Sequence, residues 1–295
     1  MSDTTAEAAD ELRTVSVDGG RRVSYATYGD PDGTPVVFLH GTPGSRRLGA
    51  LFDAAAGRRG VCLVAPDRPG FGASSPWPDR ALDDTAAFLA PVLDDAGVDA
   101  APVVGFSGGG PHALAMAAAE PTRVDAISLV ASAVPPSVES DPPWSRRLVA
   151  ALADRTPRLL GVTLRFQAAI AARSSPAFVA SQYTADEREV PGDVAETVKR
   201  DFLEGFDAGA SGAVTEFDLL STPWVDLLDD VDCPVFLRHG DADATVPVDG
   251  ARRLHERLGR SRLTVLEDAD HLATLRRSRA AVLDAYTGVS ETPAP

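Results

Sequence analysis

Short apolar runs alternate with segments of helical periodicity along most of this chain. The first two runs, residues 14–17 and 23–28, alternate apolar and polar positions and predict strands joined at Asp18-Gly19-Gly20. Apolar runs too short for a helix predict buried strands, and apolar positions at three- and four-residue spacing predict helices. The buried strands predicted in this way are 36–39, 61–65, 103–106, 124–131, 235–239 and 263–266. The predicted helices are 46–59, 81–96, 109–119, 248–258 and 272–286.

Between residues 135 and 230 the strand pattern stops, and the segment is helix-like and broken by prolines. Strands that alternate with helices predict an α/β fold, a mostly parallel sheet with helices on both faces and an antiparallel pair at its edge. The helical segment follows the carboxyl end of a strand, where open α/β sheets bind ligands. We therefore expect a core of residues 12–134 and 231–287, a helical cap at 135–230 and flexible tails at 1–11 and 288–295.

The chain is strongly acidic. Its 295 residues include 43 acidic and 28 basic ones, a net charge of −15, and Lys199 is the only lysine. This charge disfavours nucleic acid as a partner, because phosphate binding needs a basic surface. A carboxylate-rich surface is typical of a halophilic protein, since salt screens its self-repulsion. A GC-rich genome would explain the arginine usage but not the charge, so both interpretations stay open.

Other classes of protein are disfavoured by what the sequence lacks. Cys62 and Cys233 are too few for a disulfide framework or a zinc site. No apolar run reaches the ~20 residues that span a bilayer, and the first eleven residues lack the apolar segment of a secretory signal. We expect a cytoplasmic protein with a small-molecule substrate and with no membrane partner, metal or cofactor. The sequence predicts no oligomeric state.

Ser107 is the candidate nucleophile. Residues 105–109, Gly-Phe-Ser-Gly-Gly, match the pattern G-x-S-x-G between a predicted strand and a predicted helix. In a sharp strand-to-helix turn of this kind, small neighbours let the chain pass and the serine hydroxyl rises above the sheet edge. The alternative is a glycine-rich connection with an N-capping serine.

A serine hydroxyl needs a base and a group that orients the base. In this architecture the chain order is serine, acid, histidine. We assign His271 as the general base, because it follows a predicted strand and a short loop and opens the last helix. The remaining histidines precede Ser107 or suit packing or solvent better, namely His40, His112, His239 and His255.

Two carboxylates follow the strand 235–239, and Asp243 is the favoured acid. It lies further into the loop, just before Val246-Pro247. Asp241 is expected to brace the turn through backbone N–H groups. Residues 131–137, which follow the preceding strand, contain no carboxylate.

The negatively charged oxygen of an acyl-transfer intermediate needs two preorganised N–H donors. Gly108 directly follows the nucleophile, and Thr42 lies in the loop His-Gly-Thr-Pro-Gly-Ser of residues 40–45. Pro43 has no N–H to donate. We therefore expect an oxyanion hole made by Thr42 and Gly108, with an ordinary strand–helix loop as the alternative.

Over about residues 12–287 the chain resembles the α/β-hydrolase fold superfamily. The matching features are, in order, His40-Gly41, Asp-Arg-Pro-Gly-Phe-Gly-Ala-Ser at 67–74, the turn at Ser107, the Asp243 loop and His271. In this superfamily the segment matching 67–74 shapes a loop near the pocket, and we interpret it as structural. Asp270 departs from the usual pattern, because relatives carry glycine there, and it adds a negative charge beside His271.

The resemblance also implies the class of reaction. Relatives that open epoxides or remove halide carry aspartate where this chain has Ser107, so serine disfavours both reactions. Esterases, lipases, lactonases, C–C bond hydrolases, prolyl aminopeptidases and cofactor-independent haloperoxidases remain. We expect a hydrolase that cleaves a carboxylic ester of a small, largely apolar molecule through an acyl-enzyme. The alternatives are a prolyl-type aminopeptidase and a low-turnover ligand-binding receptor.

The helical segment holds eight of the chain's 18 aromatic residues, which predicts either an apolar pocket or the segment's own core. Phe202 and Phe206, four residues apart, should face the same side. An aminopeptidase would need carboxylates there to hold a substrate ammonium. The available ones are interpreted as a solvated helix face, and they are Glu204, Asp207 and Glu216.

Overall fold

The computed structural model describes residues 12–139, 142–184 and 190–287, so the predicted tails lie outside the described residues. The strands are β1 (Arg13–Val17), β2 (Arg21–Gly29), β3 (Thr34–Leu39), β4 (Val61–Pro66), β5 (Ala101–Phe106), β6 (Val124–Val130), β7 (Val235–Gly240) and β8 (Ser261–Leu266). The helices that flank them are α1 (Asp53–Gly57), α2 (Thr85–Asp95), α3 (Gly109–Ala119), α9 (Val248–Arg257) and α10 (His271–Thr287). Every predicted strand is present.

The strands form an eight-stranded sheet in the order β1-β2-β4-β3-β5-β6-β7-β8. β2 pairs antiparallel with β1 and β4, and the other neighbouring strands are parallel. Every residue of the central strand β5 is buried, as expected for a parallel strand that helices cover on both faces. The mostly parallel α/β sheet with an antiparallel edge is confirmed.

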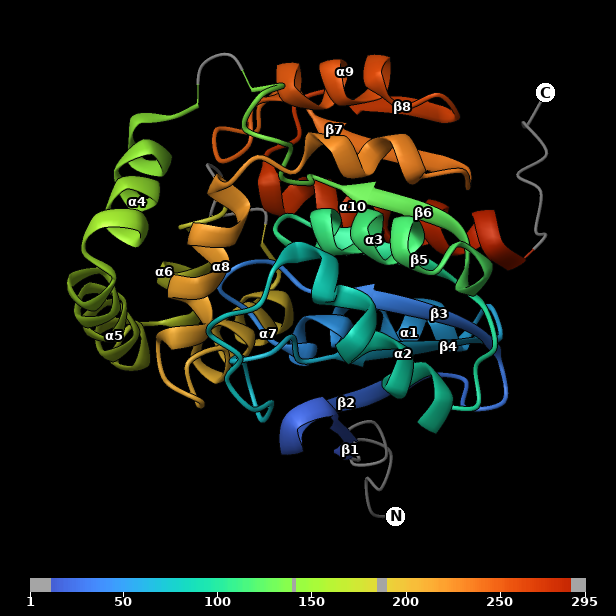
Figure 1. Ribbon diagram of the computed structural model, residues 1–295, viewed down its shortest axis with the longest axis horizontal. Coiled ribbons are helices and arrows are strands. Elements are labelled where there is room, and N and C mark those ends of the chain that lie inside the picture. The colour runs from blue at the N-terminus through green and yellow to red at the C-terminus, as the bar shows by residue number, and fades with distance from the viewer. Residues whose placement is uncertain (1–11, 140–141, 185–189, 288–295) are drawn as a thin grey trace.

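Each face of the sheet has its own apolar core (Figure 1). Phe88 of α2 and Leu114 of α3 pack on one face, whereas Leu275 and Leu283 of α10 pack on the other. The predicted helix 46–59 is shorter and more irregular than expected. Its first part is a 3₁₀ helix over Arg46–Phe52, and only α1 is α-helical. These layers fix the carboxyl ends of the parallel strands, where the candidate site residues lie.

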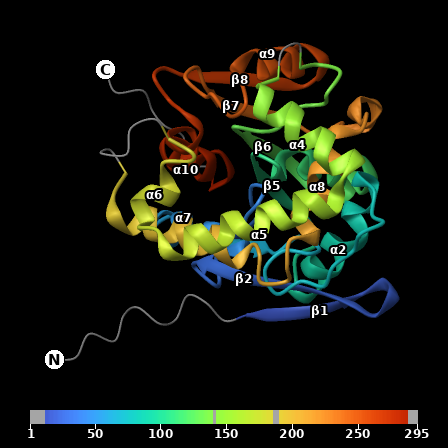
Figure 2. The ribbon, with the colours of Figure 1, turned by 90° about the vertical axis from the view of Figure 1, so that its left-hand side faces the viewer.

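Between β6 and β7 the described residues form five α-helices and a 3₁₀ helix (Val225–Asp230), and residues 142–184 and 190–230 contain no strand. The α-helices are α4 (Trp144–Arg155), α5 (Pro157–Arg173), α6 (Pro176–Ala180), α7 (Gly192–Glu204) and α8 (Ser211–Ser221). We call this group the helical insertion. Figure 1 shows it at one end of the sheet, and Figure 2 shows α4 and α5 on the outside of that end. In the described part of the chain, no helix is long and apolar enough to cross a membrane.

Candidate active site

Ser107 lies at the turn from β5 into α3. Its φ of 51° is left-handed, a conformation that residues other than glycine rarely adopt. Neighbouring glycines make the turn possible: a Cβ on Gly105 would lie 2.6 Å from the Cα of Gly110, and one on Gly109 would collide with the carbonyl oxygen of Leu39. This is the strand-to-helix turn that the sequence predicts around Ser107, and it presents the side chain at the sheet edge.

His271 and Asp243 form a buried pair. Nδ1 of His271, the first residue of α10, lies 2.7 Å from Oδ2 of Asp243 in the loop after β7. The two residues are only 2% and 4% exposed. Burial alone would raise the pKa of the Asp243 carboxyl, but His271, the Val246 N–H and His239 together outweigh it, and the pKa lies below its ordinary value. A carboxylate bound to Nδ1 fixes the ring orientation and leaves Nε2 to exchange a proton.

Asp243 also holds its own loop in place. Its Oδ1 accepts hydrogen bonds from the backbone N–H groups of Thr245 and Val246, each at 2.9 Å. Asp241 is exposed, and its backbone N–H donates to the carbonyl of Leu266 at 3.2 Å. The prediction that Asp241 braces this turn was therefore wrong, because Asp243 uses one oxygen for the turn and the other for His271.

Sequence reasoning missed His239, which lies beside the acid at the end of β7. Its Nε2 is 2.8 Å from the carbonyl oxygen of Val246 and 3.6 Å from Oδ2 of Asp243. Burial lowers the pKa of His239, so the neutral ring donates to the Val246 carbonyl. The only sequence signal was its position four residues before Asp243.

Two hollows meet at Ser107. A small cavity of about 50 Å³ is lined by Ser107 and His271 and by Tyr183 and Asp201 of the helical insertion. A wider groove of about 320 Å³ runs from Ser107 between α4 and α8, where Val149 is one of its apolar residues. The helical insertion therefore supplies walls to both hollows, although its action as a cap stays a prediction.

The two residues predicted to form the oxyanion hole lie beside Ser107. Thr42 follows β3, Gly108 precedes α3, and both line the groove with Ser107. α3 begins at Gly109, so the positive end of its helix dipole lies next to Ser107. Their role as N–H donors stays a prediction.

Arg68 holds the loop that contains Thr42. The guanidinium is fully buried and donates to the carbonyl oxygens of His40 and Gly41 and, at 2.8 Å, to the hydroxyl of Thr42. Glu216 of α8 accepts from Nη2 of Arg68 at 2.9 Å. The loop beside the nucleophile is thereby connected to the helical insertion.

Glu216 is the centre of this buried charge cluster. Besides Arg68 it contacts Arg80 at 2.5 Å and Nε2 of His112 at 3.0 Å. Burial opposes its ionisation, but Arg68, His112 and Arg80 together hold its pKa well below the ordinary value. The interpretation of Glu216 as part of a solvated helix face was wrong, because its partners lie far away in sequence and no local pattern reveals them.

Asp201 of α7 is a second residue that the sequence reasoning missed. Its Oδ1 accepts from the backbone N–H of Ser45 at 2.6 Å and from the Ser45 hydroxyl at 3.2 Å. The residue is buried and lines the small cavity that Ser107 and His271 share. Burial raises the pKa of Asp201 to about 8, so the carboxyl group is largely protonated at neutral pH.

Two further carboxylates near the site hold the backbone. Asp270 accepts from the N–H of Ala273 at 2.8 Å and from the hydroxyl of Thr184, so its charge is directed to the start of α10 and to the helical insertion. Asp67 is buried and accepts from both the backbone and the guanidinium of Arg46 at 2.7 Å. This agrees with the structural interpretation of residues 67–74.

The aromatic residues of the insertion have mixed positions. Phe202 and Phe206 face the same side as predicted, with ring centroids 5.3 Å apart. Trp144, Phe166 and Phe178 are instead 76%, 67% and 50% exposed. For these three residues the expectation of a pocket or a core was wrong.

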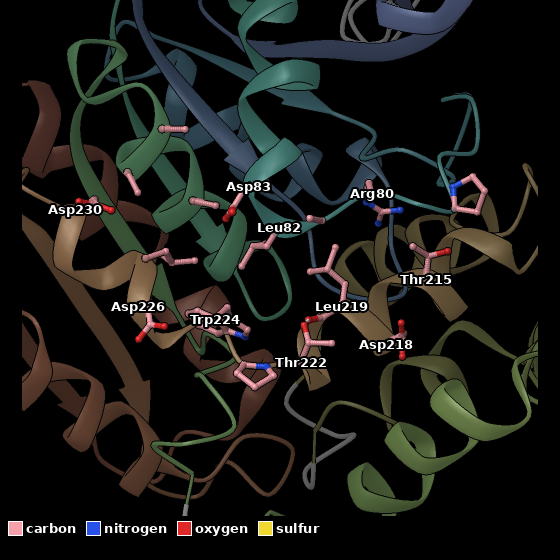
Figure 3. A pocket seen from close by; sticks show the side chains of 17 residues that line it. Arg80, Leu82, Asp83, Thr215, Asp218, Leu219, Thr222, Trp224, Asp226 and Asp230 are labelled. Carbon is pink, nitrogen blue, oxygen red and sulfur yellow. The ribbon is translucent and has the colours of Figure 1, made fainter.

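A larger cavity of about 660 Å³ lies away from the candidate site (Figure 3). Arg80, Leu82, Leu219 and Trp224 are among its lining residues, together with several aspartates. None of the five predicted site residues lines it. Within the described ranges, no three His, Cys, Asp or Glu side chains are placed to hold a metal ion.

Comparison with known proteins identifies the family. Residues 34–277 match the alpha/beta hydrolase fold family. The chain is 31% identical to a non-heme chloroperoxidase of Streptomyces lividans over 88% of this chain and 93% of that protein. It is 25% identical to the uncharacterized hydrolase YcgS of Bacillus subtilis (strain 168), over 91% and 94% of the two chains.

Solved structures agree on the fold. A thermophilic esterase from Thermogutta terrifontis superposes with a TM-score of 0.71 at 21% identity, covering 95% of this chain and 99% of that chain. The family match spans far more than half of the sequence and contains Thr42, Ser107, Gly108, Asp243 and His271. The chain therefore belongs to the α/β-hydrolase family, as its sequence motifs predicted.

Proposed function

We propose that this hydrolase is a serine hydrolase that cleaves the carboxylic ester of a small, largely apolar substrate. The observation that supports this most strongly is the buried His271–Asp243 pair, 2.7 Å apart, whose histidine shares a cavity with the left-handed Ser107. This combination contains a nucleophile, a base and a group that orients the base.

The reaction would proceed through an acyl-enzyme. Ser107 Oγ attacks the acyl carbon while Nε2 of His271 takes its proton, and Asp243 stabilises the imidazolium that results. N–H groups of Thr42 and Gly108 donate to the oxyanion. His271 then protonates the departing alcohol and activates a water molecule, which hydrolyses the ester bond to Ser107 and returns the proton to the serine.

The two hollows would divide the substrate between them. The cavity of about 50 Å³ has room for a group of a few atoms, whereas the groove of about 320 Å³ accepts a longer apolar group. Val149, Phe217 and Leu220 give the groove its apolar lining. A short acyl group or alcohol would therefore face Asp201, and the longer part would lie along α4.

Covalent labelling tests this proposal. A fluorophosphonate probe should modify the protein once, and peptide mapping should place the modification on Ser107. Ser107→Ala should abolish labelling, while Ser145→Ala, which changes another serine lining the groove, should leave it intact. Labelling of a different residue would refute the assignment. Sustained hydrolysis of p-nitrophenyl acetate, rather than a single burst, separates the enzyme from the receptor alternative.

A second candidate reaction rests on the relative named a non-heme chloroperoxidase, which is 31% identical over most of both chains. Hydrogen peroxide would replace water in the second step and attack the acyl-enzyme, which would release a peroxyacid that oxidises halide. Bromination of a dye in the presence of acetate, peroxide and bromide tests this candidate. Activity that is lost in Ser107→Ala would support it, and activity that persists would exclude a route through the acyl-enzyme.

The aminopeptidase alternative now depends on Asp201. Glu216 is paired inside the protein, and Glu204 pairs with Arg46 and Arg47. Asp201 lines the small cavity, and it would have to ionise to pair with a substrate ammonium, which its raised pKa opposes at neutral pH. Hydrolysis of proline p-nitroanilide, lost in Asp201→Asn while ester hydrolysis remains, would favour this alternative. No turnover of the anilide would remove it.

A further inference from the structure

The outer surface of the helical insertion carries an unusual concentration of exposed apolar side chains. The described residues include nine large hydrophobic side chains that are exposed, and seven of them lie on α4, α5 and α6. The other two, Leu12 and Val265, are isolated from this group. Single exposed hydrophobic residues are normal in a soluble fold, but a group of them on adjoining helices marks an interaction site.

Six of these side chains lie on the two consecutive helices α4 and α5, and we call this group the apolar face. They are Trp144 and Leu148 on α4 and Leu159, Val162, Phe166 and Ile170 on α5. On each helix they recur at intervals of three or four residues, so they lie along one side of it. Leu160 and Leu164 of α5 point the other way into the insertion. Figure 2 shows α4 and α5 at the front of the molecule, in front of the sheet and at an angle to one another.

The charge of these two helices is opposite to that of the protein. α4 and α5 contain six arginines and one acidic residue, Asp154, in a chain whose net charge is −15. Arg158 and Arg165 are exposed along one margin of the apolar stripe of α5, and Arg173 is exposed at the end of the helix. A helix with an apolar stripe beside a basic margin is typical of segments that lie in the interface of a membrane.

We propose that the apolar face docks on an anionic lipid surface. Moving exposed apolar side chains from water into the headgroup boundary lowers the free energy of the system. The arginines at their margin attract the anionic headgroups. Charge argues against a second copy of this chain as the occupant, because two basic margins would repel one another. The sequence predicted no membrane partner because it lacks a spanning segment, but a surface contact does not need one.

Docking in this orientation would place the lipid beside the groove. Ser145 and Val149 line the groove that leads to Ser107, while Trp144 and Leu148, one position earlier in α4, belong to the apolar face. α4 thus contributes side chains both to the apolar face and to the groove that Ser107 lines. The consequence that lipid-borne esters reach Ser107 rests on the proposed function, whereas the docking itself does not.

Cosedimentation of the full chain with vesicles tests the docking. Vesicles of phosphatidylglycerol and phosphatidylcholine in equal parts should bind the protein in dilute buffer. Pure phosphatidylcholine vesicles should bind it much less, and molar NaCl should weaken binding to the mixed vesicles. Val162→Ser with Phe166→Ser should weaken binding about tenfold or more. Arg158→Gln with Arg165→Gln should weaken it about tenfold.

Matched controls come from β8, which exposes both residue types. Val265→Ser and Arg262→Gln should bind vesicles as the unmodified protein does. Circular dichroism verifies that each variant is folded in the buffer used. Ser107→Ala should also bind normally, so a failure of the proposed function remains distinguishable from a failure of docking.

Three results would overturn the proposal. One is a lack of binding of the unmodified protein to the mixed vesicles, and another is equal loss of binding in the β8 controls. The third is a dimer, measured by light scattering without lipid, that Phe166→Ser dissociates. That result would assign the apolar face to a second copy of this chain.

Discussion

Asp243 combines two tasks in one carboxylate. Oδ1 fixes the turn at Thr245 and Val246, and Oδ2 faces Nδ1 of His271. A neutral amide could keep the turn through its oxygen, but its NH₂ group would then meet Nδ1 and force the wrong tautomer. Residue 243 therefore needs both the position of its two oxygens and a negative charge to orient His271.

Asp243→Asn should therefore remove turnover without removing the fold. We expect kcat for p-nitrophenyl acetate to fall about 10³- to 10⁴-fold. Asp241→Asn, an exposed change two residues earlier, should stay within about twofold. Steady-state kinetics on the two variants measures the difference, and the reverse ranking would move the acid to Asp241.

Asp201 should make stability depend on pH. Burial raises its pKa from 3.8 to about 8 on folding, so the folded state keeps a proton that the unfolded chain has lost. The stabilisation is complete below the unfolded pKa and is lost as pH rises through the folded pKa. The free energy of unfolding should therefore decrease between about pH 5 and about pH 9.

Asp201→Asn removes this titration while its amide oxygen can still accept from Ser45. The decrease in the free energy of unfolding over that pH interval should be smaller in the variant by up to about 4 kcal/mol. Urea titrations of both proteins at the two pH values measure it. If the free energy of unfolding changes with pH to the same extent in the two proteins, the ionisation of Asp201 does not affect the stability of the fold.

Among the elements, α8 connects the helical insertion to the loop that contains Thr42. Its Glu216 pairs with Arg68, and Arg68 in turn holds the carbonyl of Gly41 and the hydroxyl of Thr42. Removing the carboxylate would leave Arg68 and Arg80 buried without their shared counter-charge. Such uncompensated charge is among the most destabilising changes in a protein interior.

We expect Glu216→Ala to lower the free energy of unfolding by about 3–5 kcal/mol. Asp218→Ala, an exposed carboxylate two residues further along α8, should change it by less than about 0.5 kcal/mol. Urea denaturation followed by circular dichroism compares the two variants. A similar loss of unfolding free energy in the two variants would show that the Glu216 cluster contributes no particular stability to the fold.

The elements of the sheet could be predicted because their signals are local. The buried strand β5, the glycine-flanked Ser107 and the helix after it are all encoded within a few neighbouring residues. Glu216 and Asp201 could not be placed in this way, because their partners are more than a hundred residues away. The exposure of Trp144 could not be predicted either, because apolar periodicity does not distinguish a core face from a docking face.

For the whole molecule, the net charge of −15 should govern the response to salt. The Debye length is about 30 Å at 0.01 M salt and about 3 Å at 1 M, so molar salt removes most repulsion between surface carboxylates. Salting-out ions also favour apolar burial. We expect Tm and activity to rise from dilute buffer to molar KCl. A flat or falling melting curve would contradict the halophilic interpretation and favour genome composition.

We propose above all that Ser107 forms the covalent intermediate. The most direct measurement is kcat of purified Ser107→Ala with an ester substrate, after its circular dichroism and Tm have been matched to the unmodified protein. We expect intact folding and a loss of turnover on the order of a millionfold. Appreciable activity in the folded variant would contradict it and require a different nucleophile.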